Sequence, residues 1–174
     1  TGYGGGAISA NQSQVFLANC TIKTNRAGSF GGGVHAAWAA VSASNCILWD
    51  NRAYWLEQET INEDTQMYGG DYTVNYSCVQ GWTGQRGGVG NHGNPPEFRN
   101  GDGSDRIPGT SDDDLRLTAG SNCIDSGNNF LVLNDFADLD ADGDVSEPTP
   151  LDLSGFARLQ DDPATPDTGH GTGP

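Results

Sequence analysis

Three aspartates at alternate positions are the strongest chemical signal in this sequence. Asp138, Asp140 and Asp142 stand in the run Asp-Leu-Asp-Ala-Asp-Gly-Asp-Val-Ser-Glu, ahead of a glycine that permits a tight turn. Ca²⁺ takes about six to eight oxygen ligands, and alternate carboxylates on a chain that curls around the ion supply them. The sequence therefore predicts a calcium loop over residues 138–147, in which Asp144 offers its backbone carbonyl.

This loop departs from the helix-loop-helix type of calcium sensor. Counted from Asp138, the twelfth position is Thr149 rather than glutamate, so Glu147 or Asp152 has to complete the set of ligands. Pro148 and Pro150 also exclude an exiting helix. We expect a free-standing calcium loop.

A second acidic stretch, residues 100–114, has looser spacing. Its aspartates stand among glycine and proline turn residues and are Asp102, Asp105, Asp112, Asp113 and Asp114. Both a second calcium site and a plain Asx-rich turn region fit this pattern. A third group, Asp161, Asp162 and Asp167, is expected to belong to a tail.

The charge of the chain is concentrated in its C-terminal part. Of the formal net charge of -15, residues 1–99 carry -2 and residues 100–174 carry -13. Divalent cations would relieve the mutual repulsion of so many carboxylates, although a solvated acidic tail is the simpler alternative. A chain with one lysine and a pI near 4.1 lacks the basic surface that binds phosphate, so nucleic acid is not expected as a partner.

The first half of the chain is internally repetitive. Gly4-Gly5-Gly6-Ala7 recurs as Gly31-Gly32-Gly33-Val34, and two further motifs, Asn19-Cys20-Thr21-Ile22 and Asn25-Arg26-Ala27, recur 26 residues later. Ser77-Cys78-Val79-Gln80 resembles a third copy of the cysteine motif, and Asn122-Cys123-Ile124-Asp125 a fourth. A period of this length is typical of proteins whose repeats stack on one another.

Each repeat contains short alternating segments separated by Asn or Gly, which indicates short strands joined by tight turns. The alternation predicts that Val15, Leu17, Cys20 and Ile22 point inward. It also predicts that Cys20 stacks on Cys46, and that Asn19 and Asn45 form a side-chain amide ladder at the turn.

With these glycine-rich starts, Asn-Cys turns and Asn-Arg-Ala ends, the chain resembles the bacterial right-handed parallel β-helix repeat proteins, which are pectate-lyase-like in fold. The run from Tyr76 to Trp82, the segment Pro95-Pro96-Glu97-Phe98 and the aspartate loop are similar to that family's terminal segment. The resemblance implies an all-β, right-handed parallel β-helix and an extracellular setting. It transfers no catalytic residue to this chain.

Family members that cleave polysaccharides by β-elimination are expected to use a Lys or Arg base beside calcium. The repeat region offers Lys23, Arg26 and Arg52 for such a role. Four tryptophans, Trp38, Trp49, Trp55 and Trp82, raise the alternative of sugar binding, because indole faces stack on sugar rings. Trp49 should face outward beside Lys23, which makes it the best candidate for ligand contact, although a structural role is the simpler interpretation.

Four cysteines at equivalent repeat positions permit disulfides, but an inward stack of small side chains favours free thiols. Zinc is not expected, because the chain has no Cys-x-x-Cys pair and its histidines, His35, His92 and His170, are scattered.

The sequence thus predicts β-helix coils over residues 1–99, with an inserted loop at 54–71, followed by an irregular, calcium-stabilised segment over 100–174. We expect an extracellular or cell-surface structural or adhesion module, a fragment or subunit of something larger, that binds Ca²⁺ and meets polysaccharide or other copies of itself. The alternative is a polysaccharide-active enzyme, a lyase or glycoside hydrolase, or its carbohydrate-binding portion. No apolar stretch is long enough to span a membrane.

Overall fold

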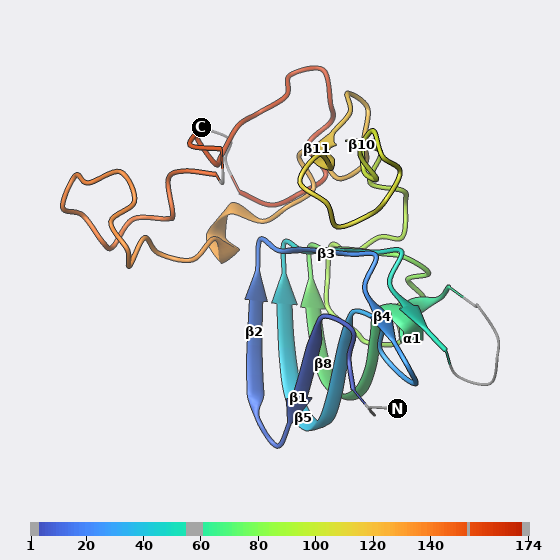
Figure 1. Cartoon of the computed structure of the whole chain (residues 1–174). Helices are drawn as coiled ribbons and strands as arrows, with labels where there is room; N and C mark the ends of the chain where they lie inside the picture. Colours follow the sequence, from blue (N-terminus) through green and yellow to red (C-terminus); the bar gives the residue numbers. More distant parts are fainter. Residues whose placement is uncertain (1–3, 55–60, 153, 172–174) are drawn as a thin grey trace.

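The computed structural model describes residues 4–54, 61–152 and 154–171, and strands dominate its regular structure (Figure 1). The described helices are the short α1 (Glu63–Gln66) and the 3-10 helix η1 (Asn129–Leu131), and neither is long and apolar enough to cross a bilayer. The all-β prediction is therefore confirmed. The strands are β1 (Ile8–Asn11), β2 (Gln14–Ala18), β3 (Thr21–Lys23), β4 (Arg26–Ala27), β5 (Val34–Ser44), β6 (Ile47–Trp49), β7 (Arg52–Ala53), β8 (Met67–Asn75), β9 (Cys78–Val79), β10 (Phe98–Asn100) and β11 (Asp114–Leu117).

Parallel pairing joins the repeats. In the first sheet, β5 lies between β8 on one side and both β1 and β2 on the other (Figure 1). A second sheet has the order β3-β6-β9, and β4 pairs with β7. The first two repeats face each other at a constant separation of 26 residues, as in the pairs Ile8–Val34, Gln14–Ala40, Thr21–Ile47 and Arg26–Arg52. The 26-residue repeat of the sequence is therefore also the separation between paired residues of the first two repeats.

The third repeat is longer than the first two. Val34 faces Met67 and Ile47 faces Cys78, so the separation grows to 33 and then 31 residues. Part of the predicted insertion at 54–71, including Trp55, Glu57 and Glu59, lies outside the described residues. Its later part forms α1, which is capped by Asn62, and then the start of β8.

The predicted alignment of the third cysteine motif is wrong by one position. Cys78 faces Ile47, and Ser77 takes the place beside Cys46, where its hydroxyl accepts a hydrogen bond from the Cys46 backbone N–H at 3.0 Å. The predicted fourth copy around Cys123 is also wrong as a repeat, because residues 121–125 form a turn rather than a strand. The longer insertion shifts the alignment, and residues after 80 no longer follow the repeat.

The core lies between the sheets and consists of the inward side chains of successive strands. Its fully buried members include Val34, Val41, Leu48, Met67 and Val74. The predicted inward residues agree with this arrangement: Ile22 is buried, and Val15, Leu17 and Cys20 are partly buried against the same cluster. Burial of these alternating apolar side chains is the main source of the stability of the sheets.

Turns recur at the same place in each repeat, and their backbone enters the left-handed region. One such position is occupied by Asn19, Asn45 and Tyr76, which have φ values of 55°, 54° and 48°. Asparagine tolerates this conformation better than most residues because its side chain bonds to nearby groups. The Asn45 amide donates to the Asn19 side-chain oxygen at 3.2 Å, which confirms the predicted amide ladder.

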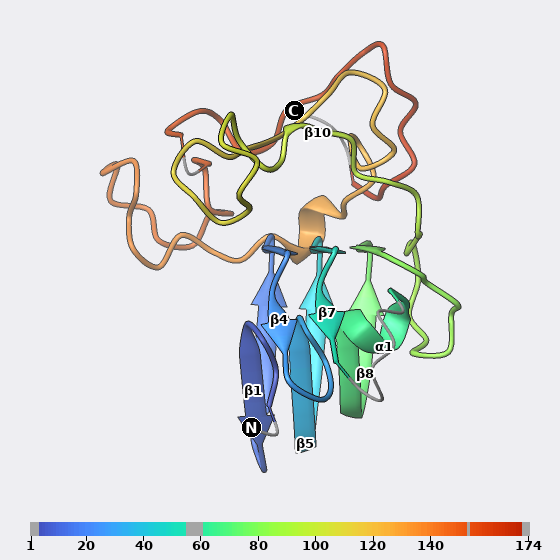
Figure 2. The same ribbon diagram turned by 45° about the vertical axis from the view of Figure 1, so that its right-hand side comes forward.

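The C-terminal part is irregular and lies beyond the arrowhead ends of β2, β5 and β8 (Figures 1 and 2). Its regular structure among the described residues is the antiparallel pair β10-β11 and η1. Side-chain hydrogen bonds are among the contacts that join it to the repeats. The side chain of Asn45 bonds to both the N–H and the carbonyl of Asn128, at 2.8 and 2.9 Å, and the Lys23 ammonium donates to Asp102 at 2.7 Å.

Candidate functional site

The predicted calcium loop is a projecting loop of the C-terminal part, and its two ends are paired. Asn134 and Pro148 form an antiparallel bridge at its base. The Asp135 backbone N–H donates to the Glu147 carbonyl at 2.8 Å, and that of Thr149 donates to Leu133 at 2.8 Å. These bonds bring the two ends of the loop together, and residues far apart along it then face one another.

Acidic side chains converge inside this loop. Carboxylate oxygens of Asp138, Asp140 and Asp142 lie within 4.8 Å of one another, and those of Asp135, Asp140 and Glu147 do the same. Asp140 belongs to both groups, so the loop holds two carboxylate triads that share this residue. With Ca–O distances of about 2.3–2.6 Å, ligand oxygens around calcium are spaced similarly. We refer to Asp135, Asp138, Asp140, Asp142 and Glu147 as the loop carboxylates.

The electrostatics of the loop are unfavourable without a cation. Asp135 is only 1% exposed, and one carboxylate oxygen of Glu147 is buried with no hydrogen-bond partner in the described part of the chain. Partial burial, together with the negative charges of Asp140 and Asp142, raises the pKa of Glu147. No basic residue stands between positions 133 and 150 to offset these charges.

Two further residues were predicted for this loop, Asp144 through its backbone carbonyl and Asp152 through its carboxylate. The Asp144 carboxylate accepts hydrogen bonds from the backbone N–H and the hydroxyl of Ser146, at 2.8 and 2.6 Å, and these bonds lower its pKa. Asp152 accepts from the backbone of Ser154 and Phe156 in a separate turn. Glu147 therefore joins the cluster and Asp152 does not. Asp135 was missed by the sequence analysis, because it precedes the alternating motif and is brought in by pairing at the base.

In the second acidic stretch, most carboxylates accept hydrogen bonds from, or form ion pairs with, other groups of the protein. The Asp112 carboxylate accepts from the backbone and hydroxyl of Ser104 and from the hydroxyl of Thr110, and these bonds lower its pKa. Asp114 pairs with Arg116 at 2.6 Å, which lowers the pKa of Asp114 to about 2.

The other three aspartates of this stretch also have partners within the protein: Asp102 pairs with Lys23, Asp105 accepts from the Ile107 backbone N–H, and Asp113 accepts from the Gly109 backbone N–H. Within the described ranges, no three of these carboxylates converge within 4.8 Å. Calcium binding here stays a prediction.

A third acidic group has a structure of its own. The predicted tail residues Asp161 and Asp167 fold back onto Asp125, and carboxylate oxygens of the three lie within 4.8 Å of one another. The backbone N–H of Asp162 donates to Asp125 at 3.2 Å. Burial, followed by the charges of Asp161 and Asp167, raises the pKa of Asp125. The prediction that these aspartates belong to a tail is therefore wrong, because the chain returns to bond with the turn at 125–127.

The predicted ligand-contact residues lie in two different sheets, and the charged groups of Lys23, Arg26 and Arg52 are engaged. Trp49 faces Lys23 in the register of β3 and β6, as expected. Segment 95–102 lies against this face, and Lys23 donates to Gly101 and Asp102 within it. Arg26 donates to the Tyr54 hydroxyl at 2.7 Å, and Arg52 bonds to Asp50. In this arrangement Lys23 is a structural anchor and is not placed to act as a base.

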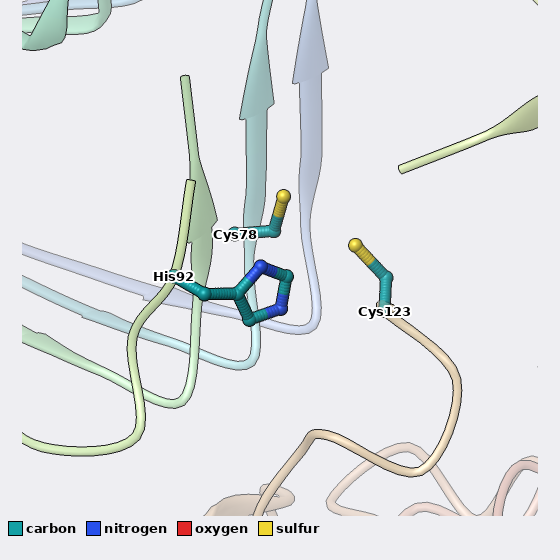
Figure 3. Close-up of side chains that lie close together, drawn as sticks. All are labelled: Cys78, His92 and Cys123. Atoms are coloured by element: carbon teal, nitrogen blue, oxygen red, sulfur yellow. The ribbon is translucent and has the colours of Figure 1, made fainter. Parts of the chain in front are cut away.

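Two cysteines and one histidine meet at the junction between the repeats and the C-terminal part (Figure 3). Ligand atoms of Cys78, His92 and Cys123 lie within 4.8 Å of one another. His92 is far from the other two histidines in the sequence, yet the fold brings it beside two cysteines. Cys78 and His92 are 14 positions apart in the chain, yet the backbone pairs them side by side in a parallel bridge. All four cysteines are free thiols, as predicted.

With this geometry established, the chain was compared with known proteins. A scan against family models, a search of curated proteins and a search of solved structures each found no match. The resemblance to pectate-lyase-like β-helix proteins therefore stays a prediction.

Proposed function

We propose that this chain is a calcium-stabilised structural module of the extracellular space or cell surface, built on coils of a right-handed parallel β-helix. Its role would be adhesion, matrix formation or display. The observation that carries the proposal is the convergence of the loop carboxylates in two triads that share Asp140, within a stretch, residues 133–150, whose sequence contains no basic residue. The β-helix assignment is supported by three sets of parallel strands that share one 26-residue register in the first two repeats.

The exposure of the loop supports an extracellular setting. Asp138 is partly exposed, and Asp140 and Asp142 are exposed. Calcium sites of extracellular modules have dissociation constants on the order of 10⁻⁴–10⁻³ M. They are occupied only where calcium is abundant, which is outside the cell. Binding would then contribute directly to stability, because the unfolded chain lacks the assembled site.

Calcium titration by calorimetry on chelator-stripped protein tests the proposal. We expect binding that Asp140→Asn weakens by roughly tenfold or more, since about 1.4 kcal/mol of lost interaction is sufficient for that factor. Asp71→Asn removes an equal charge from an exposed strand position and should leave binding unchanged. Absence of calcium binding, or equal binding by the wild type and Asp140→Asn, would contradict it.

The strand edge supports self-assembly as one form of this function. Within the described ranges, β1 and β2 pair with β5 alone and leave their other edge open. An open edge of parallel strands is a template for another strand, so a further coil or a second copy could continue the sheet. Sedimentation at increasing protein concentration would detect such association.

Carbohydrate binding is a second candidate, supported by Trp38 rather than by the predicted Trp49. Trp38 is 88% exposed and lies in an open depression with Gln12, Gln14 and Asp71. A flat indole beside hydrogen-bonding side chains is suited to a sugar ring. Tryptophan fluorescence titrations of wild type and Trp38→Ala with acidic polysaccharides test binding. Assays for released unsaturated uronates test the polysaccharide-lyase alternative.

A further inference from the structure

The cluster of Cys78, His92 and Cys123 has the donor chemistry of a transition-metal site. Thiolate sulfur and imidazole nitrogen are the preferred ligands of Zn²⁺, and they differ from the all-oxygen sets that hold calcium. The three residues come from β9, from the strand-like segment beside it and from a turn of the C-terminal part. The cluster is therefore separate from the calcium loop in both place and chemistry.

The side chain of His92 is held in position and is available to a ligand. Its backbone N–H donates to Ser77 at 3.1 Å, and its carbonyl accepts from Val79 at 2.9 Å, so the residue is fixed against β9. Both ring nitrogens are buried, and neither has a hydrogen-bond partner among the residues that the structure describes. Buried polar atoms normally have partners, and a metal ion would supply one here.

The two thiols are also held by their surroundings. Cys78 is buried in the second sheet, and its thiol donates to the Asn94 carbonyl at 3.1 Å. Cys123 lies in a turn anchored by the buried Ser121, whose hydroxyl accepts from the Cys123 backbone N–H at 3.2 Å.

The spacing of the cluster is close to that of a bound ion. Tetrahedral zinc with Zn–S distances of about 2.3 Å places neighbouring ligand atoms roughly 3.3–3.8 Å apart. Ligand atoms already within 4.8 Å require movements of only about 1 Å. A cavity of about 100 Å³ adjoins both thiols and is large enough for a water molecule as the fourth ligand.

We infer that Cys78, His92 and Cys123 bind one Zn²⁺ ion, which clamps the C-terminal part onto the last repeat. Two zinc–sulfur bonds and one zinc–nitrogen bond form, and each thiol releases its S–H proton to solvent. No oxidant or reductant is required. Because protons are released, binding weakens as the pH falls. The ion links β9 to a turn 45 positions further along the chain, as counted from Cys78 to Cys123.

The test is metal titration of the reduced, metal-stripped full chain in saturating calcium, so that its result is independent of the calcium loop. We expect one Zn²⁺ per chain by competition with a chromophoric chelator. Substitution by Co²⁺ should give the intense near-ultraviolet absorption of cobalt–thiolate bonds. Each of Cys123→Ala and His92→Gln should weaken zinc binding by at least roughly 100-fold, since even residues that only support metal ligands contribute about 10–100-fold.

Matched controls separate the site from general thiol and imidazole binding. Cys20→Ala and His170→Gln alter the same residue types outside the cluster and should leave zinc binding unchanged. Far-ultraviolet circular dichroism of each variant checks that it folds, and the partly exposed Cys123 and His92 are preferred to the buried Cys78 for this reason. Three outcomes overturn the proposal: no stoichiometric zinc uptake, uptake unaffected by both site variants, or a Cys78–Cys123 disulfide that forms in air despite equimolar zinc.

Discussion

Asn51 shows how a single buried amide joins three successive repeats. Its side chain is fully buried, and its oxygen accepts from both the backbone and the side chain of Asn25 at 3.0 Å. Its NH₂ group donates to the Ile22 carbonyl and to Gln66, each at 2.8 Å. Every hydrogen-bonding atom of this side chain is therefore used away from water, where an unpaired partner is costly.

Replacing Asn51 by alanine should destabilise the fold by about 2–4 kcal/mol, because it leaves several buried partners unsatisfied. Asn19→Ala is the matched control. That side chain is only partly buried and accepts one bond from Asn45, so a loss of about 0.5–1.5 kcal/mol is expected. Denaturant unfolding of both variants measures the difference, and equal losses would show that Asn51 is not a junction of this kind.

Replacing Glu147 by glutamine should have opposite effects on thermal stability with and without calcium. Its pKa is raised in the folded loop, so its protonated form favours folding, and this contribution is lost as the pH rises through the folded-state pKa. Glu147→Gln removes the charge permanently. In calcium-free protein near neutral pH it should therefore raise the melting temperature, whereas with calcium present it should reduce the gain that the ion provides.

Asp144→Asn is the control for this experiment, because the pKa of Asp144 is shifted in the opposite direction to that of Glu147. Bonds from Ser146 lower the pKa of Asp144, so its charged form favours folding, and that contribution is lost as the pH falls through the folded-state pKa. This variant should not stabilise the calcium-free protein. Melting curves from about pH 4 to about pH 7 distinguish the two carboxylates. A calcium-free Glu147→Gln protein that melts below wild type would refute the proposed charge repulsion.

At the scale of the strands, the backbone conformation of the turns is repeated although the residue types are not. Gln12 and Trp38 occupy equivalent bends of the first two repeats, with φ values of 47° and 53°. In the third repeat, Gly70, with φ of 55°, makes this bend alone opposite residues 37–39. The stacked strands determine the direction of the chain at this bend. The residue at this bend must therefore adopt a left-handed backbone conformation, which only glycine adopts without strain.

Trp38→Gly should stabilise the protein by about 0.5–1 kcal/mol, because it relieves this strain while the exposed indole contributes little burial. Gly70→Ala should destabilise it by about 1 kcal/mol or more. Its added Cβ would lie 2.5 Å from the Ala39 carbonyl oxygen, in a backbone conformation unfavourable for alanine. Ala40→Gly, at an exposed strand position with ordinary φ, should be mildly destabilising. Chemical denaturation checks all three, and destabilisation by Trp38→Gly would contradict the account of strain.

At the scale of the whole molecule, the chain has two parts with different sources of stability. The repeats are held by continuous ladders and an apolar core, whereas the C-terminal part has few strands and most of the negative charge. The contacts of Asn45 with Asn128 and of Lys23 with Asp102 join the two parts. A part built mainly of turns opens more readily than one with a packed core.

Removal of calcium should therefore loosen residues 100–160 before the repeats unfold. Hydrogen exchange followed by mass spectrometry, with and without chelator, is the appropriate measurement. We expect faster exchange around residues 128–152 and unchanged protection in β5 and β6. Restoring calcium should restore protection, which controls for irreversible damage. Equal acceleration throughout the chain would show that the two parts unfold together.

The sequence by itself determined the features that depend on local pattern. These are the all-β composition, the 26-residue register, the Asn19–Asn45 ladder and the converging alternate carboxylates Asp138, Asp140 and Asp142. Each follows from neighbouring residues or from a repeat, because stacking equivalent segments places equivalent side chains together.

Only the tertiary structure decided where the non-repeating residues meet. Asp135 joins the loop carboxylates through pairing at the base of the loop, and Asp125 receives Asp161 and Asp167 from the returning chain. His92 reaches Cys78 through one parallel bridge, and Cys123 reaches both from a turn of the C-terminal part. Contacts of this kind arise when the chain closes a loop in space, and neither residue type nor spacing along the sequence specifies which partners that closure brings together.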